Sequence, residues 1–332
     1  MVLVRSPLDF NTDRLFVDLQ WVLGVPLFLK CEGFNFAGSV KMKAAQAMVE
    51  DAERTGWLKP GCVLVESSSG NLGVALSILA ASKGYGFVCV TDLRVNETTR
   101  RTMDALGTRV VVIREPDPEG GLLGARIKYV KSLVASDPRY VWLNQYANPA
   151  NAGAHFATTG PDIAAEYPEL DVLFVGAGTT GTLTGCGRYF RQRRQDGHKA
   201  VHVVGVDAVG SVTFGGPATS RMIPGLGTGV RPPQLDEEVV DDVVLVEEPD
   251  TIRTCRSLAR RGFLFGGSTG TVVSGAATWL ERYGTPDLTA VAIAPDLGER
   301  YLDTVYHDSW VEEIFGREVL DPSGTTAPHR AA

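Results

Sequence analysis

The sequence predicts an α/β protein with parallel sheets and helices on both faces, and three observations support this class. Short apolar runs rich in β-branched residues alternate with segments of helical periodicity. The alternation occurs in two series, separated by the segment 144–155. Glycine-rich loops stand at several junctions where a strand meets a helix. Strand, helix and strand repeated in this way indicate parallel strands joined by helical crossovers.

The first series of elements starts with the apolar run "CVLVE", which predicts a strand at 62–66. A helix is expected at 71–84, because apolar residues recur there at helical spacing and Gly84 is typical of a helix C-terminus. The remaining elements predicted in this series are a strand at 86–92, a helix at 96–107 and a strand at 108–114.

The second series has the same character and follows the segment 144–155, "NQYANPANAGAH", which predicts an irregular stretch at a domain boundary. The segment 321–332, which follows the second series, consists of small and polar residues and predicts a flexible C-terminal tail. The elements predicted for the second series are strands at 171–178, 200–208, 243–248 and 288–296 and helices at 182–195, 251–262 and 271–284.

Composition narrows the possible functions of the 332 residues. A content of 44% hydrophobic and 21% charged residues suits a globular protein with a sizeable core, and the net charge of −7 argues against nucleic acid as the main partner. No apolar run is long enough for a membrane span, and the N-terminus lacks the apolar centre of a signal peptide, so we expect a cytoplasmic protein. The five scattered cysteines and five histidines show no metal-binding spacing, so no metal site is predicted.

The loop "ESSSGNLG" (66–73) joins a predicted strand to a predicted helix. Capping of the helix explains one or two of its polar residues, but not all of Ser67, Ser68, Ser69 and Asn71. Hydroxyls and backbone N–H groups at a helix start form a natural carboxylate site. The loop therefore predicts a ligand site at the carboxyl end of its strand.

A second loop, "GAGTTG" (176–181), has the GxGxxG spacing of a dinucleotide site. Asp207 ends the next strand, but it lies farther along than the acidic residue of such sites, which falls about 20 residues on. The hydroxyls of Thr179, Thr180 and Thr182 favour direct contacts to a phosphate monoester instead. A third loop, "FGGSTG" at 265–270, is compatible with either a ligand site or a simple capped turn.

Together, five motifs in order resemble the cysteine synthase and cystathionine β-synthase family of pyridoxal-phosphate (PLP) enzymes, of fold type II. The match spans about residues 25 to 305. The motifs are "NFAGSVK" (35–41), "SSSGNLG" (67–73), "GAGTTGT" (176–182), "GGSTG" (266–270) and "PDLGERYL" (295–302).

The resemblance implies two three-layer αβα domains with parallel-rich twisted sheets and the cofactor in the cleft between them. The smaller domain, with the substrate-carboxylate loop, is expected at 37–150. The larger domain, which binds the cofactor phosphate, is expected at 1–36 and 151–315, and a flexible tail at 316–332. The family also implies a homodimer.

The resemblance also assigns roles to individual residues. Lys41 matches the lysine that holds PLP as a Schiff base and acts as the catalytic base, which requires a lowered pKa. Ser268 matches a serine at the pyridine nitrogen, and Asn71 matches an asparagine at the ring hydroxyl. The residues that match the phosphate-binding loop are Gly178, Thr179, Thr180, Gly181 and Thr182. Those that match the binding site of the substrate carboxylate are Ser68, Ser69, Gly70, Asn71 and Gln145.

Three departures from the family pattern bear on the substrate. Phe36 replaces a proline, Met42-Lys43 replaces Asp-Arg, and Leu72 replaces a threonine of the carboxylate loop. These departures favour the siderophore branch of the family, in which O-phospho-L-serine reacts through an α-aminoacrylate with L-glutamate on the way to 2,3-diaminopropionate. The alternative is a cysteine synthase that uses O-acetylserine or O-phosphoserine with sulfide.

Both phosphoserine and glutamate are anionic and need cationic or polar contacts. The candidates are Arg126, Arg221 and the hydroxyl of Tyr146, which neighbours Gln145. Two alternative functions from other classes of protein remain. One is a nucleotide-binding oxidoreductase whose site is the motif "VGAGTTG", and the other is a catalytically silent scaffold.

Overall fold

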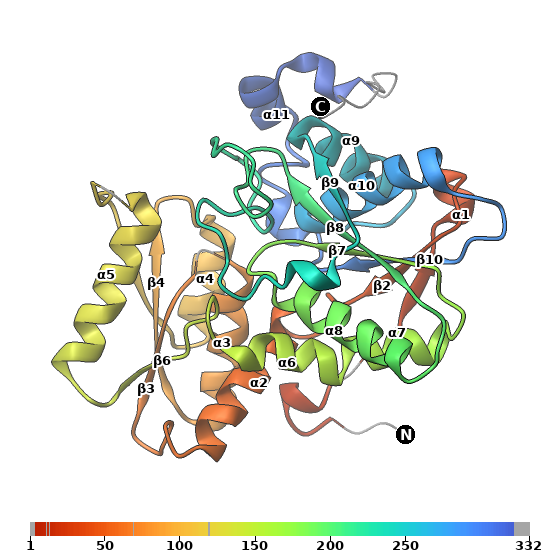
Figure 1. Ribbon diagram of the computed structural model, residues 1–332. Coiled ribbons are helices and arrows are strands. Elements are labelled where there is room, and N and C mark those ends of the chain that lie inside the picture. The colour runs from red at the N-terminus through yellow and green to blue at the C-terminus, as the bar shows by residue number, and fades with distance from the viewer. Residues whose placement is uncertain (1–3, 11, 13, 69, 119, 322–332) are drawn as a thin grey trace.

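The computed structural model describes residues 4–10, 12, 14–68, 70–118 and 120–321. Two sheets organise this part of the chain, and Figure 1 shows them side by side, each with helices packed against it. The strands of the six-stranded sheet, in spatial order, are β1 (Phe16–Asp18), β2 (Leu27–Cys31), β10 (Ala290–Ala294), β7 (Val172–Gly176), β8 (His202–Ala208) and β9 (Asp242–Val246). Those of the four-stranded sheet are β5 (Arg109–Ile113), β4 (Gly86–Asp92), β3 (Val63–Ser67) and β6 (Tyr140–Trp142).

Almost all neighbouring strands run parallel, as the alternation of strands and helices predicts. The exception is the pair β1 and β2, which is antiparallel. Strand β10 lies between β2 and β7, with Ala290 opposite both Leu27 and Val172. The last strand of the second series therefore lies inside the larger sheet, where it pairs with a strand from the N-terminal part of the chain.

Eleven α-helices are assigned within the described residues. They are α1 (Gln20–Leu23), α2 (Lys41–Arg54), α3 (Asn71–Lys83), α4 (Glu97–Ala105), α5 (Gly121–Ser136), α6 (Pro149–Ala157), α7 (Thr159–Glu166), α8 (Gly181–Gln195), α9 (Glu248–Ala259), α10 (Gly267–Tyr283) and α11 (Asp308–Phe315). Four short 3-10 helices complete the set: η1 (Pro7–Asp9), η2 (Glu237–Val239), η3 (Glu299–Tyr301) and η4 (Arg317–Leu320).

Each sheet is covered on both faces, because alternate strand residues point to opposite sides. In β7, Phe174 packs into a core with α9 and α10, whereas Leu173 and Val175 pack into a second core with α7 and α8. In the smaller sheet, Leu64 packs with α2, α3 and α4, whereas Val65 packs with α5. The two three-layer αβα arrangements predicted from the sequence are thereby confirmed.

The segment 144–155, which the sequence predicts to be irregular, is mostly helical. Asn148 accepts a hydrogen bond from the backbone N–H of Ala150 at 3.0 Å, and Pro149 occupies the first turn of α6. The Asn-Pro pair therefore begins a helix here and does not mark a loop. Asparagine caps a helix N-terminus, and proline suits the first turn because the N–H that it lacks would be unsatisfied there. Helix α6 packs against both α2 and α8, and so it connects the layers of the two sheets.

The segment predicted as a flexible tail begins with folded residues. Helix η4 buries Val319 in a small core with Ile252, Tyr301 and Val311, so residues 316–321 do not fit that expectation. Residues 322–332 lie outside the described part of the chain.

The cysteines behave as small apolar side chains, as expected. All five are free thiols, and burial raises the pKa of Cys31, Cys89 and Cys255 to about 12. Within the described stretches there is no cluster of three or more His, Cys, Asp or Glu side chains suited to a metal ion. None of the described helices combines the length and apolar character that crossing a membrane requires.

Candidate active site

Lys41 is the first residue of α2, where that helix meets the segment that follows β10. The backbone N–H of Val40 donates to the carbonyl of Pro295 at 2.7 Å, and Ser39 bridges to Asp296. These contacts fix the start of α2 between the two sheets. Burial lowers the pKa of Lys41 to about 8, since a desolvated ammonium loses the water that stabilises its charge. A large fraction of this side chain is therefore a free amine near pH 8.

The loop between β3 and α3 places polar groups beside the same segment. Ser68 Oγ accepts hydrogen bonds from the backbone N–H groups of Gly70 and Gly73, at 3.3 and 3.0 Å. Ser67 is buried, and its hydroxyl has no hydrogen-bond partner among the described residues. A Cβ added at Gly70 would meet no atom within 4 Å, so open space lies in front of this loop. Ser69, also predicted to bind the carboxylate, lies outside the described residues.

Asn71 links this loop to the six-stranded sheet. Its Nδ2 donates to Asp296 Oδ2 at 3.3 Å, and its Oδ1 accepts from the guanidinium of Arg300. Arg300 also donates to the carbonyl of Ala37 at 2.6 Å. The motif "PDLGERYL" therefore holds both the start of the lysine segment and the carboxylate loop.

The loop between β7 and α8 has the shape of an anion cradle. Thr180 has a φ of 65°, which a side-chain-bearing residue rarely adopts, and its side chain does not cap α8. A Cβ at Gly178 would come within 2.9 Å of the carbonyl of Gly225, and one at Gly181 would overlap the side-chain amide of Asn151. Only glycine leaves room for this close backbone path, and the first N–H groups of α8 follow directly after it, where a helix start suits an anion.

Asn151 ties this cradle to Gln145. Its Nδ2 donates to Thr179 Oγ1 at 3.2 Å and to the carbonyl of Gln145 at 2.9 Å. Gln145 in turn donates from Nε2 to the carbonyl of Ser67 at 3.2 Å. The predicted carboxylate loop and the predicted phosphate loop are therefore joined through two buried amides.

Glu66 organises the base of the carboxylate loop. Its carboxylate accepts from the backbone N–H of Ser67 at 2.8 Å, from Trp142 Nε1 at 2.9 Å and from the backbone N–H of Gln145 at 3.2 Å. Burial raises the pKa of Glu66 to about 7, although these hydrogen bonds oppose the rise. Glu66 therefore acts as a shared acceptor for the ends of β3 and β6.

Ser268 lies in the first turn of α10 and is buried beside Gly225, where an added Cβ would overlap its hydroxyl. Asp296 receives the hydroxyl of Tyr301 at 2.6 Å and the backbone N–H of Thr269 at 3.3 Å. Burial raises the pKa of Asp296 and is the largest influence on it. The hydroxyl of Ser268 therefore sits next to a fixed, buried hydrogen-bond network.

Arg126 differs from an ordinary surface arginine, because only 4% of it is exposed. Its Nε lies 3.4 Å from Asp92 Oδ2, yet Nε and Nη1 have no hydrogen-bond partner among the described residues. Burial raises the pKa of Tyr146, and the charge of Arg126 opposes that rise. The same charge reaches Cys89, whose thiol lies 3.4 Å from the carbonyl of Ser68. Arg126 is therefore a buried cation near the carboxylate loop.

Arg221 makes its contacts with the loop in which it lies. Its guanidinium donates to the carbonyl of Gly210 and packs against Gly227. The structure thus separates the two arginine candidates by their surroundings. A cavity of about 770 Å³ lies elsewhere, between Phe36, α3 and α4, and none of the predicted site residues lines it.

The donor set fits PLP. The site contains a buried amine, a side-chain amide, a buried serine hydroxyl and a loop of glycines and threonines at a helix start. The amine suits an aldehyde, the amide and the hydroxyl suit a ring, and the loop suits a phosphate monoester. The fold and these groups define a PLP-dependent enzyme of fold type II. Consistent with this, the chain belongs to the family described as pyridoxal-phosphate dependent enzyme, whose model matches residues 17–296. The oxidoreductase reading of "VGAGTTG" is therefore wrong.

Two curated relatives of this chain are named as synthases. The chain is 39% identical over 290 residues to N-(2-amino-2-carboxyethyl)-L-glutamate synthase of Ralstonia nicotianae, which covers 87% of this chain and 84% of that protein. It is 37% identical over 300 residues to the enzyme of the same name from Cupriavidus metallidurans, with 89% and 86% covered.

Solved structures agree with the fold. The structure of O-ureido-L-serine synthase has a TM-score of 0.82 and 35% identity, and covers 91% of this chain and 95% of that one. A hydrogen sulfide-producing enzyme from Fusobacterium nucleatum has a TM-score of 0.82 and 26% identity, with 91% and 99% covered. This protein is accordingly a PLP-dependent synthase.

Sequence reasoning missed several residues of this site. Glu66 begins the quoted loop at 66–73 but was assigned no role, and Asn151 carries no motif of its own, because their roles depend on groups distant in sequence such as Trp142 and Thr179. Asp296, Arg300 and Tyr301 lie inside the quoted motif "PDLGERYL", and their polar character within it was the available signal.

Proposed function

We propose that this protein converts O-phospho-L-serine and L-glutamate into N-(2-amino-2-carboxyethyl)-L-glutamate and inorganic phosphate. In this β-replacement the Cβ–O bond to phosphate breaks, a bond forms between Cβ and the glutamate nitrogen, and that nitrogen releases a proton. The two relatives named for this product support the choice. The product would serve the formation of 2,3-diaminopropionate for siderophores or other secondary metabolites, and we expect a cytoplasmic homodimer.

The buried Arg126 is the observation that carries the choice of phosphoserine. Guanidinium N–H groups without partners are costly when buried, so a site that keeps them is built to receive an anion. Tyr146 adds a hydroxyl close to the same charge. An O-acetyl group carries no charge, so it would offer these N–H groups no ionic partner beyond Asp92.

The remaining residues divide the other tasks. When bound, PLP withdraws electrons from Cα of the amino acid and so makes its proton acidic. Lys41 holds the cofactor, and as a free amine its Nζ removes the Cα proton and later returns it. Asn71 would hold the ring hydroxyl of PLP, Ser268 would contact its ring nitrogen, and the 178–182 loop would hold its phosphate group.

The substrate carboxylate is assigned to the loop at 68–71 together with Gln145. Ser68 Oγ accepts from the backbone N–H groups of Gly70 and Gly73 and so fixes the turn into α3, and Gln145 Nε2 donates to the carbonyl of Ser67. Backbone N–H groups at the start of α3 suit a carboxylate because the helix dipole places partial positive charge there. This contact orients Cα toward Lys41.

A second candidate is a cysteine synthase that combines O-acetylserine or O-phosphoserine with sulfide, and the sulfide-producing neighbour favours it. Purified holoenzyme given phosphoserine or O-acetylserine, each with L-glutamate or sulfide, separates the two when products are identified by mass spectrometry. We expect phosphoserine with glutamate to be the fastest pair. O-acetylserine with sulfide as the fastest pair would overturn the proposal.

A further inference from the structure

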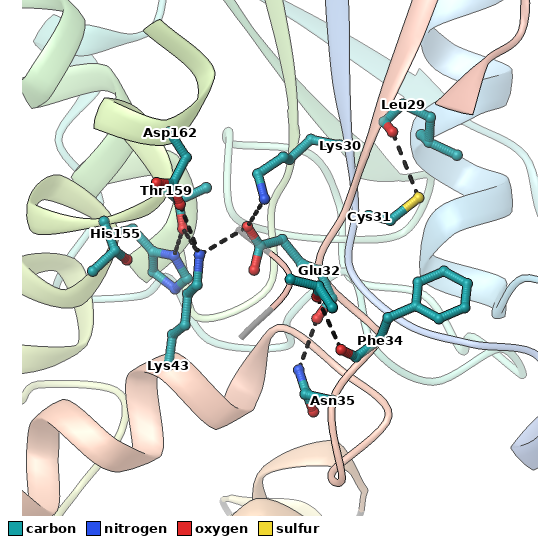
Figure 2. Close-up of polar contacts among 12 residues, drawn as sticks. Leu29, Lys30, Cys31, Glu32, Phe34, Asn35, Lys43, His155, Thr159 and Asp162 are labelled. Atoms are coloured by element: carbon teal, nitrogen blue, oxygen red, sulfur yellow. Dashed lines mark hydrogen bonds and ion pairs between the residues drawn. The ribbon is translucent and has the colours of Figure 1, made fainter. Parts of the chain in front are cut away.

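Lys43 takes no part in the proposed chemistry, yet it stands at the centre of a largely buried charge cluster (Figure 2). Its Nζ lies 3.0 Å from Glu32 Oε1 and 3.4 Å from Asp162 Oδ2. Lys30, which is fully buried, lies 3.0 Å from the same Glu32 oxygen. Among the described residues, the ammonium groups of Lys30 and Lys43 therefore share one charge cluster with the carboxylates of Glu32 and Asp162.

A chain of hydrogen bonds leads from this cluster to the predicted phosphate loop. Lys43 Nζ lies 3.4 Å from Thr159 Oγ1, and Thr159 Oγ1 lies 3.0 Å from His155 Nδ1. The other ring nitrogen, Nε2, lies 3.2 Å from the hydroxyl of Thr182. Two side chains, those of Thr159 and His155, therefore connect the ammonium of Lys43 to Thr182 of the loop at 176–182.

Donor and acceptor rules set the direction of this chain. Burial lowers the pKa of His155 well below its ordinary value, with the charge of Lys43 adding to the effect, so the ring is neutral and one nitrogen donates while the other accepts. An ammonium only donates, so Thr159 accepts from Lys43. The hydroxyl hydrogen of Thr159 then needs an acceptor, and His155 Nδ1 is in place to serve.

The opposite order would cost free energy. If His155 donated from Nδ1, Thr159 would accept from both neighbours, and its own hydrogen would lose the imidazole acceptor. Thr159 is fully buried, and an unsatisfied buried donor costs about 1–3 kcal/mol. The favoured order places the histidine proton on Nε2, from which it is donated to Thr182. The hydroxyl hydrogen of Thr182 is then free to point toward an anion.

We propose that Lys43 is a positioning residue that, through Thr159 and His155, orients the hydroxyl of Thr182 as a donor to the phosphate group of PLP. This inference rests on the proposed role of Thr182 in the phosphate loop. It also assigns a role to Lys43, which departs from the family pattern. The ammonium of Lys43 sets which group donates and which accepts in each hydrogen bond from Thr159 to Thr182.

The test uses Lys43→Met and Thr159→Val, which remove the cation and the hydroxyl with little change in shape. Lys43→Arg and Thr159→Ser are the conservative partners, and Lys131→Met is an exposed control. Nitrogen-15 NMR of the histidines in the apoprotein, assigned with His155→Asn, reports which ring nitrogen is protonated. Equilibrium titration with PLP, without substrate, reports cofactor affinity. Thr159→Val keeps the charge cluster intact should Lys43→Met fold poorly.

We expect a proton on Nε2 in the natural protein, a changed tautomer signal in Lys43→Met and Thr159→Val, and PLP affinity lowered roughly three- to tenfold in both. The conservative partners should stay close to the natural protein. A proton on Nδ1, or unchanged signals and affinity in both removing variants, would overturn the proposal.

The variant Thr182→Val distinguishes a failure of the proposed hydrogen-bond chain from a failure of the proposed phosphate-binding role of Thr182. If Thr182→Val binds PLP as tightly as the natural protein, the cofactor role of Thr182 is wrong and the chain cannot position it. The NMR signal, read without cofactor, decides the hydrogen-bond order independently of that role.

Discussion

Lys41 and Lys43 stand two positions apart, yet the fold gives them different surroundings. Lys41 is buried without a neighbouring charge among the causes of its lowered pKa, and this environment produces a reactive amine. Lys43 lies between Glu32 and Asp162, which favours its ammonium form. Residues two positions apart on a helix face different ways, but the partners of Lys43 lie as far away as Thr159, 116 positions on.

The pKa of Lys41 predicts the pH dependence of cofactor capture. Only the free amine reacts with an aldehyde, so the rate at which apoprotein takes up PLP should rise with pH through about 8. An unperturbed lysine would give a midpoint near its ordinary pKa of 10.5. Stopped-flow absorbance measures the rate, and Lys41→Ala should abolish the pH-dependent phase. A midpoint close to the ordinary value would contradict the burial argument.

Arg126 gives a prediction about substrate affinity. Replacing Arg126 by Met should raise KM for O-phosphoserine roughly ten- to hundredfold, since a charge-assisted hydrogen bond contributes about 1.5–3 kcal/mol. KM for O-acetylserine should change little. Arg221→Met is the matched variant, because Arg221 already donates to Gly210. The assignment fails if Arg221→Met alone raises KM, or if both substrates are affected equally.

At the scale of elements, the glycine loops were predictable because their chemistry is local. A strand followed by glycines and hydroxyls specifies a helix start with free N–H groups, and the structure places α3, α8 and α10 directly after such loops. The start of α6 was not predictable from the same signals, since Asn-Pro serves both turns and helix caps. What decides between them is the packing of α6 on α2 and α8, which involves distant parts of the chain.

A pair of glycine substitutions tests the cradle. Gly181→Ala should lower the free energy of unfolding by about 1–3 kcal/mol and weaken PLP binding, because the new methyl group overlaps Asn151. Gly153→Ala, within α6 and with open space around it, should raise stability by about 0.5–1 kcal/mol. Denaturant unfolding and PLP titration measure both effects. Equal stability changes in the two variants would refute the close approach.

At the scale of the whole molecule, the two sheets meet through a few buried polar groups. Asp296 accepts from Tyr301 and Thr269 on one side and from Asn71 on the other. The parallel strands and the helical layers followed from sequence periodicity, whereas these cross-connections did not. Asn71 and Asp296 are 225 positions apart, and only the folded chain brings them together.

Asp296 therefore bears on overall stability. Asp296→Ala removes the side-chain acceptor of donor groups on Tyr301, Thr269 and Asn71, and each donor left buried without a partner costs about 1–3 kcal/mol. We expect a marked fall in the unfolding midpoint of the apoprotein together with weaker PLP binding. Asp303→Ala, an exposed change close in sequence, should alter stability by no more than about 0.5 kcal/mol. Similar midpoints for the two variants would show that Asp296 does not join the sheets.

The most direct test of the account is to find the lysine that holds the cofactor. Borohydride reduction of the purified holoenzyme, followed by digestion and mass spectrometry, fixes PLP to its lysine and locates it. The account predicts a pyridoxyl group on Lys41 and none on Lys43, with both lysines read in the same experiment. A pyridoxyl group on Lys43 or another lysine, or no modified lysine in protein reconstituted with PLP, would contradict it.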